Sequence, residues 1–324
     1  MAQPANLFDR VDINNSVRED LIDKIYNVSP EEVPVSTAFG KTTATNTYHE
    51  WQRDTLASAN KDNALIDGDD FSATALTGTD RVGNYTQIFS KQPAISRRAN
   101  IVKKAGQKTA MAYAKAKMMK EMKRDIEASI LSNNPAVAGN SSTASKSAGL
   151  GAMVYTNISS GAGGSTTTHN SGAATSAPVA GTNRAFTETL LKTVVQSAYN
   201  NSGAIPAMVV MTPSHKTTFS GFTGIAVNRY QVSKKEQGRI IGGADVYMSD
   251  FGELEIVPHY IMTTSAPNTV FLCNPEFASL AFLDGFRSTP IGQTGDSEKE
   301  LITADVCLRV DSQAAFAKIA DLTA

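Results

Sequence analysis

The stretch RRANIVKKAGQKTAMAYAKAKMMKEMKRDIEASILSN, residues 97–133, carries the strongest helical signal in the chain. Small and apolar residues recur in it every three or four positions, a spacing that gathers side chains on one face of an α-helix. The residues in this pattern are Ile101, Ala105, Ala112, Ala116, Met119, Ile126 and Ile130. Gly106 is a weak point, which marks either a bend or the true start of the regular helix. The stretch predicts one long helix, roughly 45 to 55 Å at 1.5 Å per residue.

The same stretch is strongly basic. Residues 97–124 contain ten Lys and Arg and one acid, Glu121, a local charge of +9 in a chain whose net charge is −1. The basic residues are Arg97, Arg98, Lys103, Lys104, Lys108, Lys115, Lys117, Lys120, Lys123 and Arg124. One interpretation is a solvated helix face that pairs with acidic segments of the same or a neighbouring subunit. The other is a surface that contacts the phosphates of a polyanion such as DNA without reading its sequence.

Composition bounds the class of protein. A chain of 324 residues, 41% of them hydrophobic, can bury a substantial core. The sequence pI near 6.4 argues against a protein that binds polyanions over its whole surface. No apolar run reaches the length of a membrane span. Cys273 and Cys307 sit in apolar stretches without the spacing of a zinc or redox site, so we expect both to be small buried residues rather than a disulfide.

Upstream of the basic helix the chain predicts an arm and a hairpin. Residues 16–26 predict a short amphipathic helix, and Pro30 and Pro34 after it favour an extended arm over residues 1–40. Residues 41–92 are threonine-rich and extended, with a polar middle at 57–83 and a returning strand in GNYTQIFSKQ (83–92). Alternation places Tyr48, Glu50 and Gln52 on one strand face and His49, Trp51 and Arg53 on the other. A two-stranded hairpin is marginally stable alone, so this one needs a partner surface.

Downstream the chain alternates helices and strands. Residues 139–183 are almost entirely Gly, Ser, Thr, Ala and Asn, and we expect an ordered but irregular excursion there. Helices are predicted over 187–200 and 213–222. Strands are predicted over 207–211, 244–249, 253–259, 270–274, 279–283 and 302–311. The fold class is therefore α+β.

Two motif fragments fail as functional sites. HEWQR (49–53) begins like a zinc-protease motif, but Arg53 stands where the second histidine is needed, in a segment that predicts a strand. FGKTT (39–43) resembles the end of a phosphate-binding loop, yet Val35 occupies the position of its first glycine and no helix follows. Neither fragment supports catalysis or nucleotide binding.

Other candidate chemistry is equally incomplete. Asp67, Asp69 and Asp70 in LIDGDD lack the spacing of a calcium loop, so they predict a solvated hairpin tip. His215 lies near a predicted helix start, where a capping or surface role is favoured over catalysis. There is no Gly-x-Ser-x-Gly motif and no evident acid–base pair. We therefore expect no catalytic residue, no metal and no cofactor.

The order of these parts resembles a known family. An arm, an extended hairpin, a long basic helix, an irregular excursion, an α/β unit and a returning strand form the layout of tailed-phage major capsid proteins with the Hong Kong 97 fold. The chain is most similar to a podophage-type capsid family formerly classed as a domain of unknown function. The segments that carry the resemblance are 18–35, 47–70, the helix from Arg97, 181–203, 220–232, 240–259 and 294–310. It extends over nearly the whole chain in collinear order.

The resemblance implies a role for each segment. Residues 1–40 would be the N-terminal arm and 41–96 the E-loop hairpin that lies over a neighbouring subunit. The P-domain would comprise residues 97–184, with the spine helix on the inner side of the shell and the Gly/Ser/Thr-rich excursion. Residues 185–285 would be the A-domain at the capsomer centre, and 286–324 would return to the P-domain. Tyr48, His49, Trp51 and Arg53 would contact the adjacent subunit, with Trp51 as an aromatic anchor.

The implied function is structural. Hexamers and pentamers would close an icosahedral shell around the double-stranded DNA of a tailed phage, in a virion assembled in the host cytoplasm. The implied partners are further copies of the chain, a separate scaffolding protein, a portal, decoration proteins and packaged DNA bound without sequence specificity, and no membrane. The chain starts at Met1 with about forty residues before the hairpin. We therefore expect no cleavage on maturation.

Two alternatives remain. A nanocompartment shell of the same fold would enclose enzyme cargo instead of a genome, and the basic helix argues against it. A metal-dependent hydrolase would use His49, Asp67, Asp69 and Asp70, although no complete site motif supports it.

Overall fold

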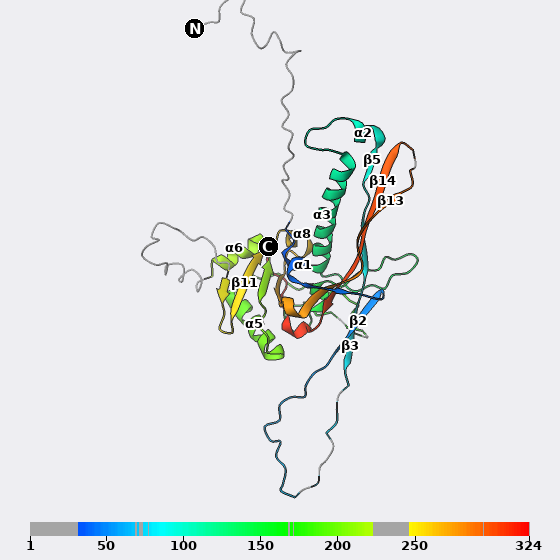
Figure 1. The fold of residues 1–324 in the computed structure, drawn as a ribbon. Helices are drawn as coiled ribbons and strands as arrows, with labels where there is room; N and C mark the ends of the chain where they lie inside the picture. The colour runs from blue at the N-terminus through cyan, green and yellow to red at the C-terminus, as the bar shows by residue number, and fades with distance from the viewer. Residues whose placement is uncertain are drawn as a thin grey trace, which may run out of the picture.

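The computed structural model describes residues 32–222 and 246–323, apart from residues 69, 71–73, 77, 168, 171 and 294. The helix predicted at 16–26, most of the predicted arm and Asp69 therefore lie outside the described residues. The helices and strands together confirm the α+β class (Figure 1). In the described part of the chain, no helix has the length and apolar character needed to cross a membrane.

Helices, short turns and strands alternate along the chain. The helices are α1 (Pro34–Ala38), α2 (Arg97–Ile101), α3 (Ala110–Ile130), α4 (Leu150–Met153), α5 (Glu188–Ser202), α6 (Pro213–Ser220) and α8 (Met262–Ser265), with 3-10 turns η1 (Pro275–Phe277) and η2 (Gln313–Ala315). The strands are β1 (Gly40–Thr43), β2 (Tyr48–Arg53), β3 (Asp80–Tyr85), β4 (Gln87–Lys91), β5 (Ala94–Ser96), β6 (Ile158–Ser159), β7 (His169–Asn170), β8 (Ala173–Ala174), β9 (Met208–Met211), β10 (Val246–Met248), β11 (Glu253–Pro258), β12 (Val270–Cys273), β13 (Ala278–Ile291), β14 (Ser297–Val310) and β15 (Ala317–Ile319).

The predicted long helix is two helices joined by an elbow. Helix α2 ends at Ile101, and α3 begins at Ala110 and runs for 21 residues. Gly106 lies in the turn between them with a φ of +72°, in the left-handed region that glycine adopts without strain. A helix of this length spans roughly 30 Å, so the predicted length of 45 to 55 Å is wrong. Gly106 was predicted to mark a bend or the true start of the regular helix; it lies in the turn before that start, which is at Ala110.

The buried stripe of α3 differs from the predicted one. Met111, Met122, Ile126 and Ile130 are buried, whereas Ile101, Ala112 and Ala116 are exposed. Alanine and methionine occur on every face of this helix, so the periodicity in its first half did not determine which face packs. Met122, Ile126 and Ile130 define the packed face, because their side chains belong to the same buried cluster as residues of the first sheet.

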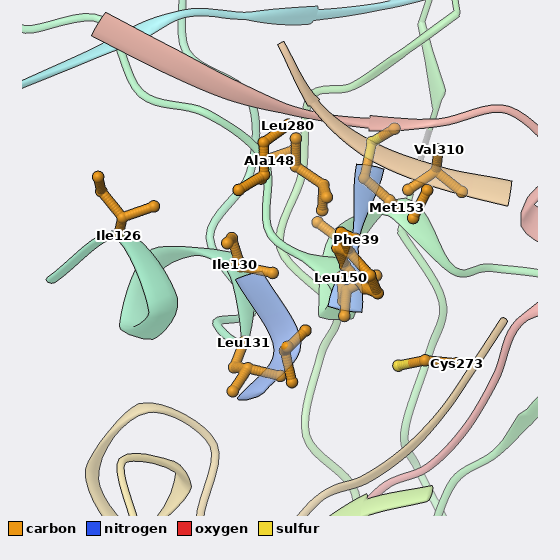
Figure 2. Close-up of a cluster of buried hydrophobic side chains, with 14 of the residues drawn as sticks. Phe39, Ile126, Ile130, Leu131, Ala148, Leu150, Met153, Cys273, Leu280 and Val310 are labelled. Atoms are coloured by element: carbon orange, nitrogen blue, oxygen red, sulfur yellow. The ribbon is translucent and has the colours of Figure 1, made fainter. Parts of the chain in front are cut away.

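The first sheet has the order β1-β13-β14-β4, and β5 pairs with the start of β14. Strands β13 and β14 form a long antiparallel pair of 14 residues each, and β1 adds in parallel to β13. Helix α3 packs across β4 and β14. In Figure 2 the end of this helix, at Ile130 and Leu131, meets Leu150 and Met153 of α4 in one apolar cluster.

The second sheet has the order β10-β11-β9-β12-β15-β6 and is covered on both faces. Alternate residues of β9, Val209 and Met211, pack under α5 and α6, while Met208 and Val210 face the core that contains α3. Strands buried on both faces read as unbroken apolar runs, as MVVM and VFLC do in this chain. The two strands predicted at 207–211 and 270–274 are therefore confirmed. The sheet that contains them separates the core around α3 from the core under α5 and α6.

The C-terminal segment and the excursion both contribute strands to the second sheet. Strand β15, near the C-terminus, joins the second sheet and not the first, and β6 from the excursion extends the same sheet. The excursion is also less peripheral than its composition suggests, because α4 is entirely buried. Its strands β7 and β8 turn back onto the hairpin, where the amide of Gly83 donates to the carbonyl of Gly172 over 3.3 Å.

We predict that Gly172→Ala lowers the free energy of unfolding by more than the cost of placing alanine at a positive φ, because the added Cβ also clashes with a neighbouring strand. Gly172 has a φ of +80°, and a Cβ there would lie 2.0 Å from the carbonyl oxygen of Arg81. Relieving that clash separates the excursion from β3, so we expect thermal unfolding to show a loss of about 3 kcal/mol.

Gly163→Ala is the matched control. Gly163 has nearly the same φ, +81°, and a Cβ added there would meet no atom within 4 Å. Its substitution carries only the conformational cost of about 1 kcal/mol. Equal losses for the two variants would contradict the packing argument.

Candidate assembly surfaces

The residues of the hydrolase alternative do not converge. His49 lies in β2 at the base of the hairpin, whereas Asp67 and Asp70 are exposed in the segment between β2 and β3. Across the described ranges, no group of three or more His, Cys, Asp or Glu residues is placed to hold a metal ion. Burial, and next the charge of Arg309, lower the pKa of His49.

His215 is a structural residue and not a surface one. Its side chain is buried, with Nδ1 lying 2.7 Å from Thr212 Oγ1 and Nε2 lying 3.2 Å from the Thr323 carbonyl. Thr212 caps α6, so the histidine joins that helix start to the C-terminal segment. Burial lowers the pKa of His215, an effect that the hydrogen bond to the Thr323 carbonyl opposes.

The hairpin is rooted in its own chain through Trp51. The indole Nε1 donates to the carbonyl of Val310 over 3.0 Å, and the guanidinium of Arg309 lies 6.0 Å from the ring centroid. Only 7% of Trp51 is exposed, so little indole surface is left for a neighbouring subunit. Sequence alternation placed Trp51 on the correct strand face, but that face meets β14 of the same chain. For Tyr48, His49 and Arg53, contact with a neighbour stays a prediction.

Asn84 is a second anchor of the hairpin. Its fully buried amide donates to Leu308 O over 2.7 Å and to Ser147 Oγ over 3.1 Å, and its oxygen accepts from Ala148 N over 2.9 Å. One side chain thus connects β3, the excursion and β14. The returning strand predicted at 83–92 breaks at Thr86, where the chain leaves β2 as a partner and joins β14 as β4.

Beyond this base the hairpin extends into solvent. We call residues 54–79 the hairpin tip. Every described residue in it is exposed, including four large apolar side chains. Their exposed fractions are 98% for Leu56, 67% for Leu65, 78% for Ile66 and 96% for Leu76. Four large apolar side chains exposed on one loop make it a candidate interaction site.

Nine of the ten basic residues fall into two groups, and Lys120 is left aside. Some pair with acids of their own chain, with distances of 2.7 Å for Arg97–Asp296, 2.8 Å for Lys115–Glu300 and 4.0 Å for Lys117–Glu121. Arg98, Lys103, Lys104, Lys108, Lys123 and Arg124 form no ion pair with the residues that the structure describes. Intrachain pairing therefore accounts for only part of the positive charge.

A buried carboxylate on α3 joins three parts of the molecule. Glu127 has no exposed surface; its Oε1 accepts from Val35 N over 2.8 Å and its Oε2 from Ser36 N over 2.8 Å, both at the start of α1. Its Oε1 also lies 2.9 Å from Nε2 of His259, which follows β11. Because Nδ1 of His259 accepts from Ile261 N over 3.1 Å, the ring proton is on Nε2, which donates to Glu127.

A buried lysine connects the excursion to the second sheet. Lys318 of β15 is 2% exposed, and its ammonium donates to the carbonyl of Gly151 in α4. Burial lowers its pKa to about 8, a shift that nearby Asp321 only partly opposes. A cavity of about 180 Å³ lies beside it, lined also by Asn133, Asn268 and Asp321.

Sequence reasoning missed Glu127, His259, Asn84 and Lys318. Each is a polar residue whose partners lie far away in the chain, so no local spacing connects them. The two cysteines, by contrast, are free and buried as predicted. Burial raises the pKa of both thiols, that of Cys307 to about 12, so neither is a reactive nucleophile.

The family model and the curated relative that match this chain are both described as major capsid proteins. The family model described as SU10 major capsid protein matches residues 4–323. The major capsid protein of Escherichia phage Phieco32 is 33% identical over 105 residues, a match that spans 32% of this chain and 30% of that protein.

Solved structures with the same fold extend over almost the whole chain. The cyanophage A-1(L) capsid asymmetric unit has a TM-score of 0.68 at 12% identity, covering 98% of this chain and 100% of that one. The holo-SrpI encapsulin complex from Synechococcus elongatus PCC 7942 has a TM-score of 0.56 at 10% identity, covering 98% and 96%. These likenesses confirm the predicted capsid-type fold.

We predict that Glu127→Gln destabilises the protein by about 3 kcal/mol in urea unfolding. The amide has one acceptor oxygen where the carboxylate has two, so at least one buried donor among Val35 N, Ser36 N and His259 Nε2 is left unpaired. Hydrogen exchange read by mass spectrometry should also speed up at residues 34–38.

Glu121→Gln serves as the control on the same helix. Glu121 makes only a 4.0 Å contact with the exposed Lys117, so its loss changes stability by a few tenths of a kcal/mol. If Glu127→Gln were as mild, Glu127 would not be a joint between the three parts.

We predict that Lys318 makes the free energy of unfolding rise as the pH rises from about 8 to 10.5, and that this contribution is absent in Lys318→Met. In the unfolded chain Lys318 titrates near 10.5, and in the fold near 8, so the unfolded state binds the extra proton between these values. Stability from this residue therefore rises as pH rises through that window, and below it the full cost is about 3 kcal/mol.

The measurement is the difference in unfolding free energy between Lys318→Met and the unsubstituted protein, taken at intervals from pH 7 to pH 10. All other titrating groups cancel in this difference. The methionine variant should be the more stable near pH 7, with its advantage shrinking as pH rises. Parallel profiles would mean that Lys318 keeps an ordinary pKa.

Proposed function

The chain belongs to the SU10 major capsid protein family, and from this premise we propose that it is the major capsid protein of a tailed phage. Copies of the chain assemble as hexamers and pentamers into an icosahedral shell around double-stranded DNA. The protein acts through geometry and not catalysis. It is part of the virion, which assembles in the host cytoplasm.

The observation that carries the proposal is the exposed hairpin tip. A rigid base, held by Trp51 and Asn84, projects a loop whose large apolar side chains stay mostly in solvent. Burying such side chains contributes about 1.5 to 3 kcal/mol each, which is available only through a second subunit. Repeated contacts of this kind, one for each subunit, support a closed shell.

The outward face of α3 supports contact with the packaged genome. Lys117, Lys120 and Lys123 are exposed on that face, and Lys117 reaches Glu121 only at 4.0 Å. Such cations bind phosphates without reading base sequence. Lys115 is a poorer candidate, because Glu300 pairs with it at 2.8 Å. We therefore assign the DNA-facing role to the three exposed lysines.

A nanocompartment shell is the second candidate, since the solved encapsulin complex shares the fold. The exposed lysines of α3 favour a polyanionic content over protein cargo. Separate scaffolding, portal and decoration proteins belong to the same proposal, with the resemblance to tailed-phage capsids as their support.

We predict that replacing Leu56, Leu65, Ile66 and Leu76 together by serine abolishes assembly without unfolding the subunit. These side chains are exposed in the isolated chain, so their loss changes its unfolding midpoint little. Negative-stain electron microscopy and sedimentation should show rings or shells for the unsubstituted protein, expressed alone or with its neighbouring genes, and smaller species for the variant. Normal shells from the variant would remove the tip from the assembly mechanism.

We predict that reversing Lys117 and Lys123 to glutamate lowers DNA retention more than shell formation. Each reversal removes a phosphate contact and adds a repelling charge, so retained DNA should fall about tenfold and with a reduced salt dependence. Nuclease-protected DNA per assembled shell is the measurement. Equal losses of shells and DNA would place these lysines in a subunit contact instead.

A further inference from the structure

A small pocket lies near one edge of the second sheet, where segments far apart in the chain converge. Its lining comes from β15, from the segments that follow α3 and α8, and from the excursion. The volume is about 180 Å³, enough for roughly six water molecules at about 30 Å³ each. Pockets for drug-sized ligands measure roughly 300 to 1,000 Å³, so this one admits a ligand of only a few heavy atoms.

A buried cation lines this pocket. Lys318 is 2% exposed, and its ammonium donates to the carbonyl of Gly151. An ammonium has three donor hydrogens, and among the described residues that carbonyl is its one hydrogen-bond partner. Burial lowers the pKa of Lys318 to about 8, so at pH 7 most of the population is still charged. Donors of a charged group therefore remain for an anion in the pocket.

A buried anion lines the same pocket. Asp321 is 6% exposed, and its Oδ2 accepts from Gly161 N over 2.9 Å. Its φ is +59°, in the left-handed region that is unfavourable for a residue with a Cβ. Gly164 leaves room for the carboxylate, since a Cβ there would lie 2.9 Å from Asp321 Oδ2. Backbone strain of this kind is concentrated at functional sites and ligand clamps.

The two charges do not neutralise each other directly. Across the described ranges no ion pair joins Lys318 to Asp321, although the carboxylate is near enough to raise the pKa of the lysine against the effect of burial. They are the two charged residues of the lining. Buried charges need partners, and opposite charges held apart in one pocket suit a ligand that carries both.

Neutral polar side chains of the lining also lack protein partners. Thr269 is 3% exposed, and its hydroxyl forms no hydrogen bond with the part of the chain that the structure describes. The same holds for the side-chain amides of Asn133 and Asn268, which are partly buried. Buried polar groups are normally hydrogen-bonded, so these groups indicate a polar occupant.

We propose that this pocket binds a small zwitterion of the amino-acid class, with its carboxylate on the ammonium of Lys318 and its ammonium on Oδ1 of Asp321. The hydroxyl of Thr269 and the amides of Asn133 and Asn268 supply the neutral contacts. A zwitterion adds no net charge to a lining whose own charges balance, whereas inorganic phosphate would bring excess negative charge against Asp321. The site belongs to the single subunit, so it is independent of shell assembly.

Binding of small probes to the full-length protein at pH 7 tests the site, with saturation-transfer NMR as the measurement. Glycine carries both charges, acetate only the carboxylate and methylammonium only the cation. We expect glycine to bind at least about tenfold more tightly than either of the other two, because each retains only one of the charge contacts.

Every other result of the probe series overturns the proposal. Acetate that binds as tightly as glycine would show that Asp321 holds no ammonium. Inorganic phosphate that displaces glycine at equal concentration would show a general anion site. If no probe binds, the pocket holds only water.

Two substitutions assign the ends of the ligand. Asparagine at 321 tolerates the left-handed conformation and keeps an acceptor for Gly161 N. Asp321→Asn should therefore weaken glycine binding about tenfold and leave acetate binding unchanged. Lys318→Met should abolish binding of both probes. Lys192→Met is the matched control that leaves both unchanged, because that lysine is exposed on α5.

Thr269→Val tests the pocket without altering a charge. Valine has a similar shape, and the hydroxyl that it removes has no partner among the described residues, so we expect the unfolding midpoint to change little. Glycine binding should weaken severalfold. Unchanged glycine binding in this variant, or in folded Lys318→Met or Asp321→Asn, would place the ligand elsewhere and overturn the proposal.

Discussion

The arrangement of this subunit depends on one buried carboxylate. Glu127 has no contact with water, so its charge is tolerated only because donors from α1 and from His259 surround it. The donors come from segments that are ninety or more residues away in sequence. The end of the arm, the helix and the second sheet are thus fixed by a single group. An apolar residue at 127 would pack, but it would leave these donors unpaired.

The base and the tip of the hairpin differ in how much they contact the rest of the subunit. Hydrogen bonds from Trp51 and Asn84 hold the base to β14 and the excursion. The described residues of its tip are all exposed. The chain passes from one to the other at β2 and β3 and returns at Thr86 to become part of the first sheet. The direction in which the tip projects is therefore fixed by the subunit core, although that core covers none of the tip residues that the structure describes.

The parts that were predictable from sequence are those with dense local patterns. The apolar runs MVVM and VFLC are strands buried on both faces, and the amphipathic segment beginning after Thr187 is helix α5. The buried face of α3 was not predictable, because its alanines and methionines fit several faces. Excursion residues such as Leu150 lie in the core despite a composition typical of loops. Their burial is set by contacts with distant segments, which local periodicity does not contain.

The contacts of the candidate site residues could not be predicted for the same reason, because they too are made with distant segments of the chain. Trp51 was assigned to the correct strand face, yet which surface meets that face depends on where β14 runs. The basic stretch was evident, but only the structure separates Arg97 and Lys115, which have acidic partners, from the exposed cations of the elbow. A loop that buries so little within its own subunit also has a kinetic consequence. Part of each contact energy is spent in ordering the tip, so single contacts stay weak and reversible. In the proposed shell, such weak contacts would let a misplaced subunit leave before the shell closes, so errors would be corrected while the assembly grows.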